Sequence, residues 1–504
     1  MNKITNDFNT SSNFEPQFIS PSSNGDWGRN AKLSYCEYMQ KNKPQSNSVA
    51  GGLLVLGAGG YHIGWLLWNV FKPHFSTTTL FFQFSCWYFG SIIGNILGAV
   101  IVTKWQKKNV YYACGTISII GSIIFVAWFH IDWLLAVGRF VSGLGHGIAY
   151  VATITHGAEN VIKEMRGRLI SSVNVMIYSS VFTLAIVMMF TSLPGGIRTE
   201  QMVGLLAISF AIMGVLFTPC LTYESVTFLL YRNNDRQAAE NMKKLRNESE
   251  VTWTISNDLQ EMKLMVTEDR MKSPNITKDS NTRPLLLMMA CSCVAVLTSN
   301  IILNTHLIQI TMTSFMPNWQ PDSETPDSAF IAAVILVTFR FSAGMIMILF
   351  GDSFSRKKCL WLSAGLSMVC LLITQILSSF VLNYSNGVNW IPGAFAVAFQ
   401  LFVGVGVESI QHVLTSEAFS TAKKYWSIAC VAISDSIIQI AIIGLCFIES
   451  SLFLAIFVYC SIVIVALLTV LLYIKLPETR GISLRQARNE FTKTSNIPEG
   501  ITYS

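Results

Sequence analysis

Charged residues are scarce in this sequence. Asp, Glu, Lys and Arg make up only 13% of its 504 residues, whereas soluble globular proteins have about 25%. This scarcity excludes a single water-soluble domain of such a length. Hydrophobic residues account for 51% of the chain and the mean hydropathy is +0.46, so the sequence indicates a membrane protein.

Several chemical signatures are also missing. No GxxxxGK(S/T) phosphate loop is present, which argues against ATP-driven pumping. The eleven cysteines lack the spacing of a disulfide framework or a zinc site, and the basic residues form no continuous patch for a nucleic-acid backbone. No nucleophile, base and orienting group can be placed together. We therefore expect no metal, no cofactor, no nucleic-acid partner and no enzymatic activity.

Long apolar runs are the main feature of the sequence. A helix needs about 20 apolar residues to cross a hydrocarbon layer about 30 Å thick, and twelve segments meet this requirement. They are 48–71, 79–102, 109–129, 132–156, 169–191, 202–221, 284–311, 328–351, 359–382, 390–415, 426–447 and 451–475. The sequence thus predicts an all-α membrane protein with twelve transmembrane helices in two six-helix bundles.

The basic residues are distributed unevenly between the two sides of these spans. Of the 35 Lys and Arg, 31 fall in the two tails and in loops that lie on one side. The opposite loops contain only Lys72 and Arg198, and Arg139 and Arg340 lie within spans. Because short basic loops stay cytoplasmic, we expect both termini in the cytosol.

The spans divide the chain into five parts. A polar tail (1–47), expected to be disordered, precedes the first bundle (48–221), and a charged linker (222–283) joins it to the second bundle (284–475), which is followed by a tail (476–504). Short amphipathic helices are predicted in the linker at 236–246 and 256–266. Asn383, in Asn-Tyr-Ser, is the candidate glycosylation site on the outer side.

The two halves of the chain carry matching features. A basic turn follows the second span and another follows the eighth. Glu159 and Glu417 close the fourth and tenth spans, and Glu224-Ser225 and Glu478-Thr479 follow the sixth and twelfth. The three offsets are 249, 258 and 254 residues. Such parallel repeats rock about a central site, which gives alternating access without enzymatic chemistry.

Several motifs carry a resemblance to a known family. Gly138–Gly147 (GRFVSGLGHG), Glu224-Ser225 and Leu476–Gly481 (LPETRG) resemble motifs of the sugar porter family of the major facilitator superfamily, and within it the insect facilitated trehalose and hexose transporters. The resemblance implies the major facilitator fold, a monomeric transport unit in the plasma membrane, and a small-molecule solute, with sugar as the first expectation.

Charged residues at the cytoplasmic ends of the spans, a pattern that recurs in both halves, predict a gate there. Ion pairs there would hold the outward-facing state and separate on opening inward. An ordinary solvated membrane border is the alternative. Arg139, inside the fourth span, is expected to form a structural ion pair within the first bundle. The gate candidates are Glu159, Arg166, Asp352, Arg356, Glu417 and Lys424.

The expected solute site departs from the family pattern. The family's glutamine in the fifth span corresponds to Asn174, and its Gln-Gln-Leu-Ser-Gly-Ile-Asn run in the seventh corresponds to 295–301 (AVLTSNI), so the glutamine pair is absent. Amides suit sugar hydroxyls because they donate and accept at once. The candidate solute-binding residues are Asn174, Thr298, Asn300, His412, Asp435 and Gln439.

Ionisable residues within the spans raise a second expectation. Glu408 and His412 share a helix face, and Asp435 and Arg340 add charge, so the solute is cationic, zwitterionic or otherwise not a plain hexose if these groups line the cavity. The alternative is that they neutralise one another. His62 and Glu408 are the proton-linked candidates, although a histidine in a span is more commonly a hydrogen-bonding core residue.

The sequence therefore predicts a sugar transporter for hexose or trehalose that works by alternating access and facilitated diffusion. Two alternatives remain. A non-transporting sugar sensor is one, but such sensors are expected to carry long cytoplasmic extensions and the second tail has only about 29 residues. The other is a transporter of the same fold for a non-sugar organic solute.

Overall fold

A computed structural model of the chain describes residues 35–69, 77–190, 197–271, 281–316, 327–384, 390–446 and 451–492. Helices and turns make up this part of the chain, and no strand occurs in it. The described residues divide into two units, of which one contains α1 (Tyr35–Lys41) and the other begins at Asn42. All features described below belong to the second unit.

Twelve helical spans in the described ranges are long and apolar enough to cross a bilayer, as predicted. Six form the first bundle: α3 (Ala50–Asn69), α4 (Thr77–Lys104), α5 (Lys107–Ala127), α6 (Asp132–Asn160), α7 (Arg166–Phe190) and α8 (Thr199–Leu221). The second bundle consists of α12 (Thr282–Ser299) with α13 (Ile301–Phe315), α14 (Asp327–Phe350), α15 (Arg356–Tyr384), α16 (Ile391–Phe402) with α17 (Ser409–Glu417), α18 (Thr421–Leu445) and α19 (Ser451–Lys475).

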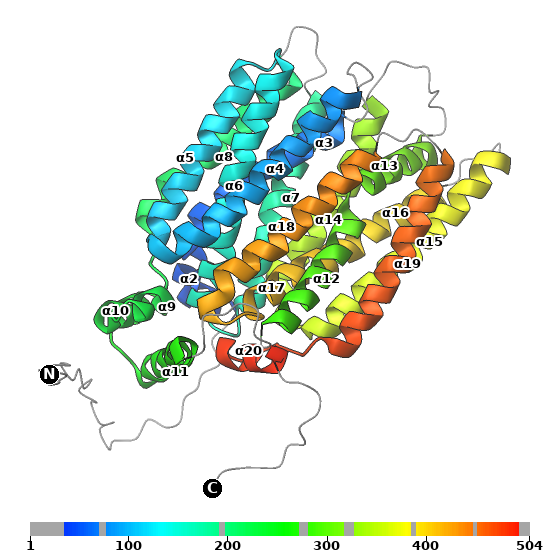
Figure 1. Cartoon of the computed structure of the whole chain (residues 1–504). Helices are drawn as coiled ribbons and strands as arrows, with labels where there is room; N and C mark the ends of the chain where they lie inside the picture. The colour runs from blue at the N-terminus through cyan, green and yellow to red at the C-terminus, as the bar shows by residue number, and fades with distance from the viewer. Residues whose placement is uncertain are drawn as a thin grey trace, which may run out of the picture. The chain divides into compact units, whose positions relative to one another are not determined.

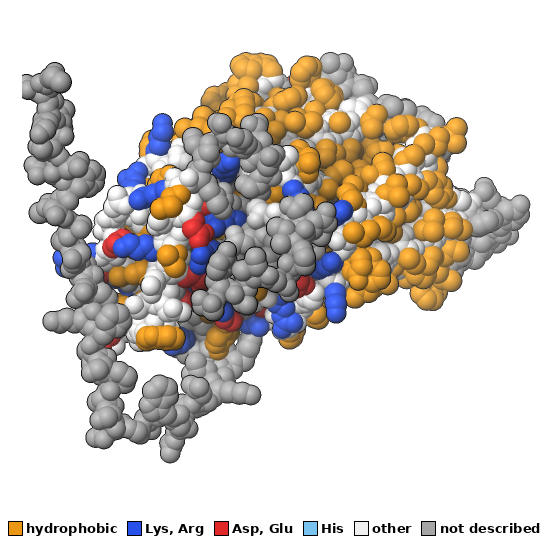
Figure 2. All heavy atoms as spheres, turned by 60° about the horizontal axis from the view of Figure 1, so that its bottom comes forward, with side chains coloured by type: hydrophobic (Ala, Val, Ile, Leu, Met, Phe, Trp, Pro, Cys, Tyr) orange, Lys and Arg blue, Asp and Glu red, His pale blue; other side chains and the backbone are white. Residues whose placement is uncertain are grey.

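The two bundles lie side by side (Figure 1). Between them, α7 packs against α14, and α4 packs against α18. Outward-facing apolar residues cover the flanks, as on α19, where Leu467 and Ile474 are about two-thirds exposed. Figure 2 shows these apolar flanks next to the end where basic and acidic side chains gather. A surface that faces lipid must be apolar in this way.

Short helices mark one end of the bundles, which we call the linker end. They are α9 (Val226–Tyr231), α10 (Asp235–Leu245), α11 (Trp253–Met271) and α20 (Leu484–Thr492) (Figure 1). The first three share a small core that includes Leu229, Met242 and Ile255. Helices α10 and α11 overlap the two predicted linker helices, whereas α9 and α20 were not predicted.

The polar stretch before the first span is partly helical. Besides α1, residues Lys43–Ser48 form α2, and the buried Gln45 side chain accepts a hydrogen bond from the Ile162 backbone at 3.0 Å. The prediction of disordered chain was therefore wrong for residues 35–41, which form α1, and for residues 43–47, where Gln45 ties α2 to the bundle. Residues 1–34 of that predicted tail lie outside the described residues. Asn383 lies in the last turn of α15, but its side chain and Ser385 are outside the described residues.

Glycines set the close approach of α4 and α6. A Cβ at Gly94 would overlap the backbone carbonyl of Leu144, and one at Gly143 would overlap the carbonyl of Trp87. The backbones thus touch where only glycine leaves room, as small residues allow in membrane helices. This packing holds α4 and α6 as one rigid wall of the first bundle.

Two spans of the second bundle are interrupted. The seventh breaks between α12 and α13, where the Asn300 side chain caps α13 by accepting from the Leu303 backbone at 2.9 Å. The tenth contains a π-helical segment, η1 (Val403–Glu408), between α16 and α17. Both interruptions lie beside the central cavity, and π segments of this kind are frequent at functional sites.

Candidate functional site

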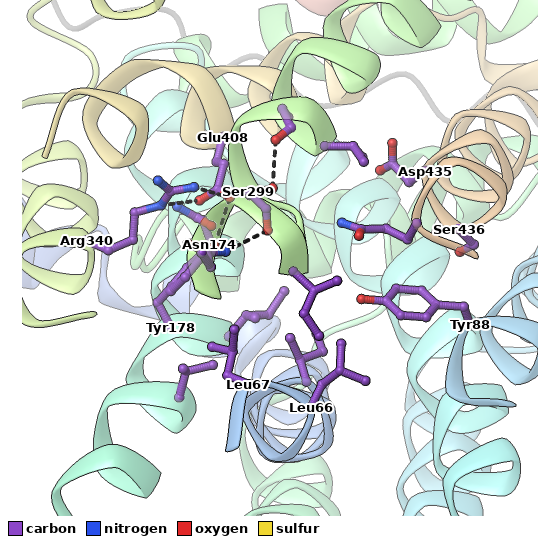
Figure 3. Close-up of a pocket in the computed structure, with 18 of the residues that line it drawn as sticks. Leu66, Leu67, Tyr88, Asn174, Tyr178, Ser299, Arg340, Glu408, Asp435 and Ser436 are labelled. Atoms are coloured by element: carbon purple, nitrogen blue, oxygen red, sulfur yellow. Dashed lines mark hydrogen bonds and ion pairs between the residues drawn. The ribbon is translucent and has the colours of Figure 1, made fainter. Parts of the chain in front are cut away.

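A cavity of about 220 Å³ lies between the two bundles and is lined from both of them. The first bundle contributes residues of α3, α4, α6 and α7, and the second contributes residues of α12, α13, α14, α16, η1, α17 and α18. Apolar side chains, including Leu66 and Leu67, form one part of the wall (Figure 3). The cavity size fits a small solute, not a macromolecule.

A buried ion pair forms one polar side of the cavity. The Arg340 guanidinium donates to Glu408 twice, from Nε at 3.0 Å and from Nη2 at 2.6 Å. Tyr178 of the first bundle also donates to Glu408, at 2.8 Å. The pair therefore joins α14 and η1 to α7, across the interface of the bundles (Figure 3).

An amide chain extends from this pair. Arg340 donates from Nη1 to the Gln400 Oε1 at 2.8 Å, Gln400 donates to Asn304 at 3.0 Å, and Asn304 donates to the Ser299 carbonyl at 3.0 Å. Gln400 is on α16, while Ser299 and Asn304 flank the break in the seventh span. The chain of bonds fixes the amides that face the cavity.

Other polar groups line the opposite side. Tyr150 of α6 and His412 of α17 meet across the bundles, with the hydroxyl 3.0 Å from the ring Nδ1. Asp435, Ser436 and Gln439 come from α18. The Asp435 Oδ1 is buried and has no hydrogen-bond partner among the residues that the structure describes. One carboxylate in the cavity is thus left without the partner that Glu408 has.

The linker end is closed by an ion cluster that spans the bundles. Glu417, at the end of α17, accepts from Arg166 of α7 at 3.0 Å and also from Arg356 of α15. All three side chains are buried. Arg166 further donates to the carbonyl of Ile482 at 3.3 Å. Because Arg166 belongs to the first bundle and Glu417 to the second, this pair must break if the linker end opens.

Asp352 makes the second link between the bundles. It accepts from the backbone nitrogens of Gly167 at 2.8 Å and Arg168 at 3.1 Å, and its Oδ1 lies 3.7 Å from Nη2 of Arg356. Burial raises the pKa of Asp352 above its ordinary value, although the two backbone bonds and the Arg356 charge act to lower it. Asp352 thus anchors the first turn of α7 to the loop after α14.

The duplicated acidic residues occupy equivalent places in the two halves. Glu224 accepts from the backbone nitrogen of Lys107 at 2.8 Å, where α5 begins, and Glu478 accepts from that of Arg356 at 3.1 Å, where α15 begins. Both carboxylates therefore satisfy unpaired N–H groups at a helix start. Glu159 accepts from Ser225 at the start of the linker. The buried Lys424 lies within electrostatic range of the carboxylates of Glu159 and Glu417.

Comparison with known proteins shows which family has this architecture. The family model described as "Sugar (and other) transporter" matches residues 25–491. The chain belongs to this family. It is 24% identical over 465 residues to the facilitated trehalose transporter Tret1 of Culex quinquefasciatus, covering 87% of this chain and 83% of that protein. It is 22% identical to the mouse facilitated glucose transporter member 2, covering 87% and 80%.

Solved structures agree on the fold. The proton:xylose symporter XylE bound to 6-bromo-6-deoxy-D-glucose matches with a TM-score of 0.71 at 15% identity, covering 91% of this chain and all of XylE. A partially occluded inward-open XylE from E. coli matches with a TM-score of 0.64 at 17% identity, covering 88% and 99%. The chain is thus a multi-pass membrane transporter with the major facilitator fold, and its relatives are named as transporters of small sugars.

Four of the six predicted solute-binding residues line the cavity: Asn174, His412, Asp435 and Gln439. Thr298 and Asn300 do not, which corrects the prediction. Thr298 donates to carbonyls of its own helix at 2.9 Å, and Asn300 caps α13. Both side chains are fully buried.

The structure also shows the contacts of the charged residues predicted within the spans. Glu408 and Arg340 neutralise each other, but Asp435 is not part of that pair. Arg139 was expected in an ion pair, yet among the described residues it donates to the carbonyls of Gln83 and His62 and stacks on Trp65. That prediction was wrong, because backbone carbonyls satisfy the guanidinium. His62 does not line the cavity, and its Nε2 lies 3.2 Å from the Ser122 hydroxyl.

Some lining residues were not predicted. The family's glutamine pair and asparagine in the seventh span correspond to Ala295, Val296 and Ile301, and all three line the cavity as apolar groups. Polar contacts come instead from residues such as Tyr88, Tyr178, Ser299, Asn304 and Gln400. One signal was present, since Tyr178 lies one helical turn after Asn174.

Proposed function

We propose that this protein carries hexose or trehalose across the plasma membrane by alternating access and facilitated diffusion, as a monomeric unit with both termini in the cytosol. One observation carries the proposal: the cavity lies between the bundles and both line it with groups that donate and accept hydrogen bonds. Asn174 of α7 and Gln439 of α18 face it from the two halves. Sugar hydroxyls need such pairs of donors and acceptors.

The ion cluster at the linker end controls whether the cavity opens to that side. With Glu417 bound to Arg166 and Asp352 bound to the start of α7, the linker end is closed. Of the 35 Lys and Arg, 31 lie in the tails and loops on this side, which supports a cytosolic linker end. The conformation then corresponds to a state closed toward the cytosol, and separation of these pairs opens the cavity to that side.

Facilitated diffusion is supported by the place of His62. This proton-linked candidate lies outside the cavity lining, packed against Phe125 inside the first bundle. Glu408, the other candidate, is held by Arg340 and Tyr178. A His62→Ala protein is expected to keep whatever pH dependence the wild type has.

The test is uptake of labelled glucose and trehalose by proteoliposomes at two pH values. We expect uptake that saturates and stops when inside and outside concentrations are equal, at both pH values. Substitution of Asn174 by Leu, which removes a cavity amide, should reduce it. Saturable binding without flux would contradict transport and favour a sensor.

A second candidate is a transporter of the same fold for a non-sugar organic solute. The apolar Ala295, Val296 and Ile301 favour it, because they stand where the family has amides. Uptake of neither glucose nor trehalose by a correctly folded preparation would favour this candidate.

A further inference from the structure

Asp435 is the carboxyl group of the cavity that has no cationic partner among the described residues. Its Oδ1 is buried without a hydrogen-bond partner, and among the described residues no basic side chain forms an ion pair with it. The other two charges that line the cavity, Arg340 and Glu408, satisfy each other through two hydrogen bonds. A buried carboxylate without a cation is costly in a low-dielectric site.

The groups around Asp435 do not supply the missing positive charge. Asp435 lies on α18, across the cavity from Arg340 and Glu408 (Figure 3). Its charge acts on Tyr88 of α4, on Tyr150 of α6 and on two thiols of α12, Cys291 and Cys293. None of these is a cation, and the ring of His412 on α17 is engaged with the Tyr150 hydroxyl.

We propose that the solute bears a protonated amine, which pairs with the Asp435 carboxylate. This inference rests on the proposed transport through the cavity, and it makes an amino sugar the preferred solute in place of neutral hexose or trehalose. An ammonium group donates a charge-assisted hydrogen bond to the Asp435 carboxylate and compensates its charge, whereas a neutral hydroxyl provides only the hydrogen bond.

The surroundings of Asp435 fit such a group. Trp87 and Tyr88 line the cavity with ring centroids 5.0 Å apart, and aromatic faces attract ammonium groups. Ser436 and Gln439, on the same helix as Asp435, offer neutral donors and acceptors for hydroxyls. The arrangement therefore selects a small hydroxylated amine, such as an amino sugar, over the corresponding neutral sugar.

Glucosamine and glucose make a matched pair of probes, since they differ by one amino group in place of a hydroxyl. Uptake of each is measured in proteoliposomes, with a protonophore present and in a mildly acidic buffer in which the amine is protonated. The variants are Asp435→Asn, which removes the charge, and Asp435→Glu, which retains it. Glu250→Gln, at an exposed position in the linker, controls for charge removal elsewhere.

The wild type is expected to prefer glucosamine by about tenfold or more, a difference typical of one buried charge pair. Asp435→Asn should lose that preference, with thermal unfolding in detergent as the check that it is folded, and Asp435→Glu and Glu250→Gln should retain the preference. Equal uptake of the two sugars by the wild type would overturn the inference and leave sugar transport standing.

Two further outcomes would also overturn it. If, without the protonophore, an inward proton gradient drives glucose uptake and Asp435→Asn abolishes this drive, the positive charge at Asp435 is a proton and not an amine. If the folded wild type takes up neither sugar, the proposed transport of sugars fails, and the inference that rests on it fails too.

Discussion

Arg340 and Glu408 are the most strongly coupled residues of the cavity. Each would be a buried, unpaired charge without the other, and Tyr178 and Gln400 complete their hydrogen bonds. Removing one member of a buried pair usually costs about 3–5 kcal/mol, whereas replacing both can be nearly neutral. Their role in the fold can therefore be separated from their role in solute binding.

We expect Arg340→Met to destabilise the protein strongly, because Glu408 is left without its cation. Glu408→Gln should also destabilise it, by leaving Arg340 unpaired. The double variant should be more stable than the sum of the single effects predicts, by about 1–3 kcal/mol. Thermal unfolding of the purified proteins in detergent measures the cycle, and simple additivity would contradict the pairing.

Glu478 gives a prediction that depends on pH. Burial acts to raise the pKa of this carboxyl, but hydrogen bonds from Ser355 and from the backbone of Arg356, Lys357 and Arg480 outweigh it, so the pKa lies below its ordinary value. A group with a depressed folded pKa stabilises the protein above its unfolded pKa and loses this contribution as pH falls through the folded value.

Glu478→Gln should therefore lower the unfolding temperature at neutral pH. The difference from the wild type should shrink as the pH falls below about 4, the ordinary range of a glutamate. The measurement is thermal unfolding across a pH series. A difference that is constant down to the most acidic buffer would show that the charge of Glu478 does not stabilise α15.

At the residue scale, the sequence revealed the ionisable and amide residues within the spans but not the groups that they contact. Arg139 and Arg340 look alike in the sequence, as lone cations within spans. In the structure, Arg139 donates to backbone carbonyls, whereas Arg340 donates to a carboxylate. The difference arises because η1 places Glu408 beside Arg340. Pairing depends on tertiary approach, which a single sequence does not specify.

At the scale of elements, the spans were predictable because each is a long apolar run, and hydropathy alone decides whether a helix can cross lipid. The interruptions were not. The break at Asn300 lies inside one apolar run, and only the cap that Asn300 makes for α13 reveals it. The same break explains why Ser299 and Asn304 line the cavity while Thr298 and Asn300 do not.

The contact of α4 with α6 can be tested with two glycines. Gly94→Ala should destabilise the protein by several kcal/mol or prevent folding, because the new methyl group would overlap the backbone of Leu144. Gly365→Ala in α15 is the matched control, since no atom lies within 4 Å of its Cβ position. Yields of folded monomer and unfolding temperatures report the outcome, and equal behaviour of both variants would refute the close approach.

At the scale of the whole molecule, the chain is two similar bundles joined at one end by breakable contacts. Its duplicated acidic residues were visible in the sequence, and the structure places Glu224 and Glu478 at equivalent helix starts. What the sequence does not specify is which contacts cross between the halves. Arg166 with Glu417 does so, and Glu159 with Ser225 does not.

Neutralising Glu417 should shift the population toward states that are open at the linker end, since Arg166 then loses its carboxylate partner in the closed state and Arg356 keeps only Asp352. A cysteine placed at Leu67, in the cavity wall, reports the change by slower labelling from the opposite side. Glu250→Gln serves as the charge control. An unchanged labelling rate in Glu417→Gln would reject the gate.

The central claim, that the two bundles must separate for transport, is tested most directly with a cross-link between them. A Cβ at Gly344 of α14 would lie 3.9 Å from the Cβ of Val175 of α7, within the range of about 3.5–4.5 Å that a disulfide needs. Val175 directly follows the lining residue Asn174, and Gly344 lies one helical turn after the lining residue Arg340. The variant is Val175→Cys with Gly344→Cys, and each single variant is its control.

Oxidation of the double variant is predicted to stop solute uptake, and a reductant should restore it, while both single variants transport under either condition. Mass spectrometry confirms that the bond has formed. Undiminished uptake by the fully cross-linked protein would contradict alternating access through this cavity.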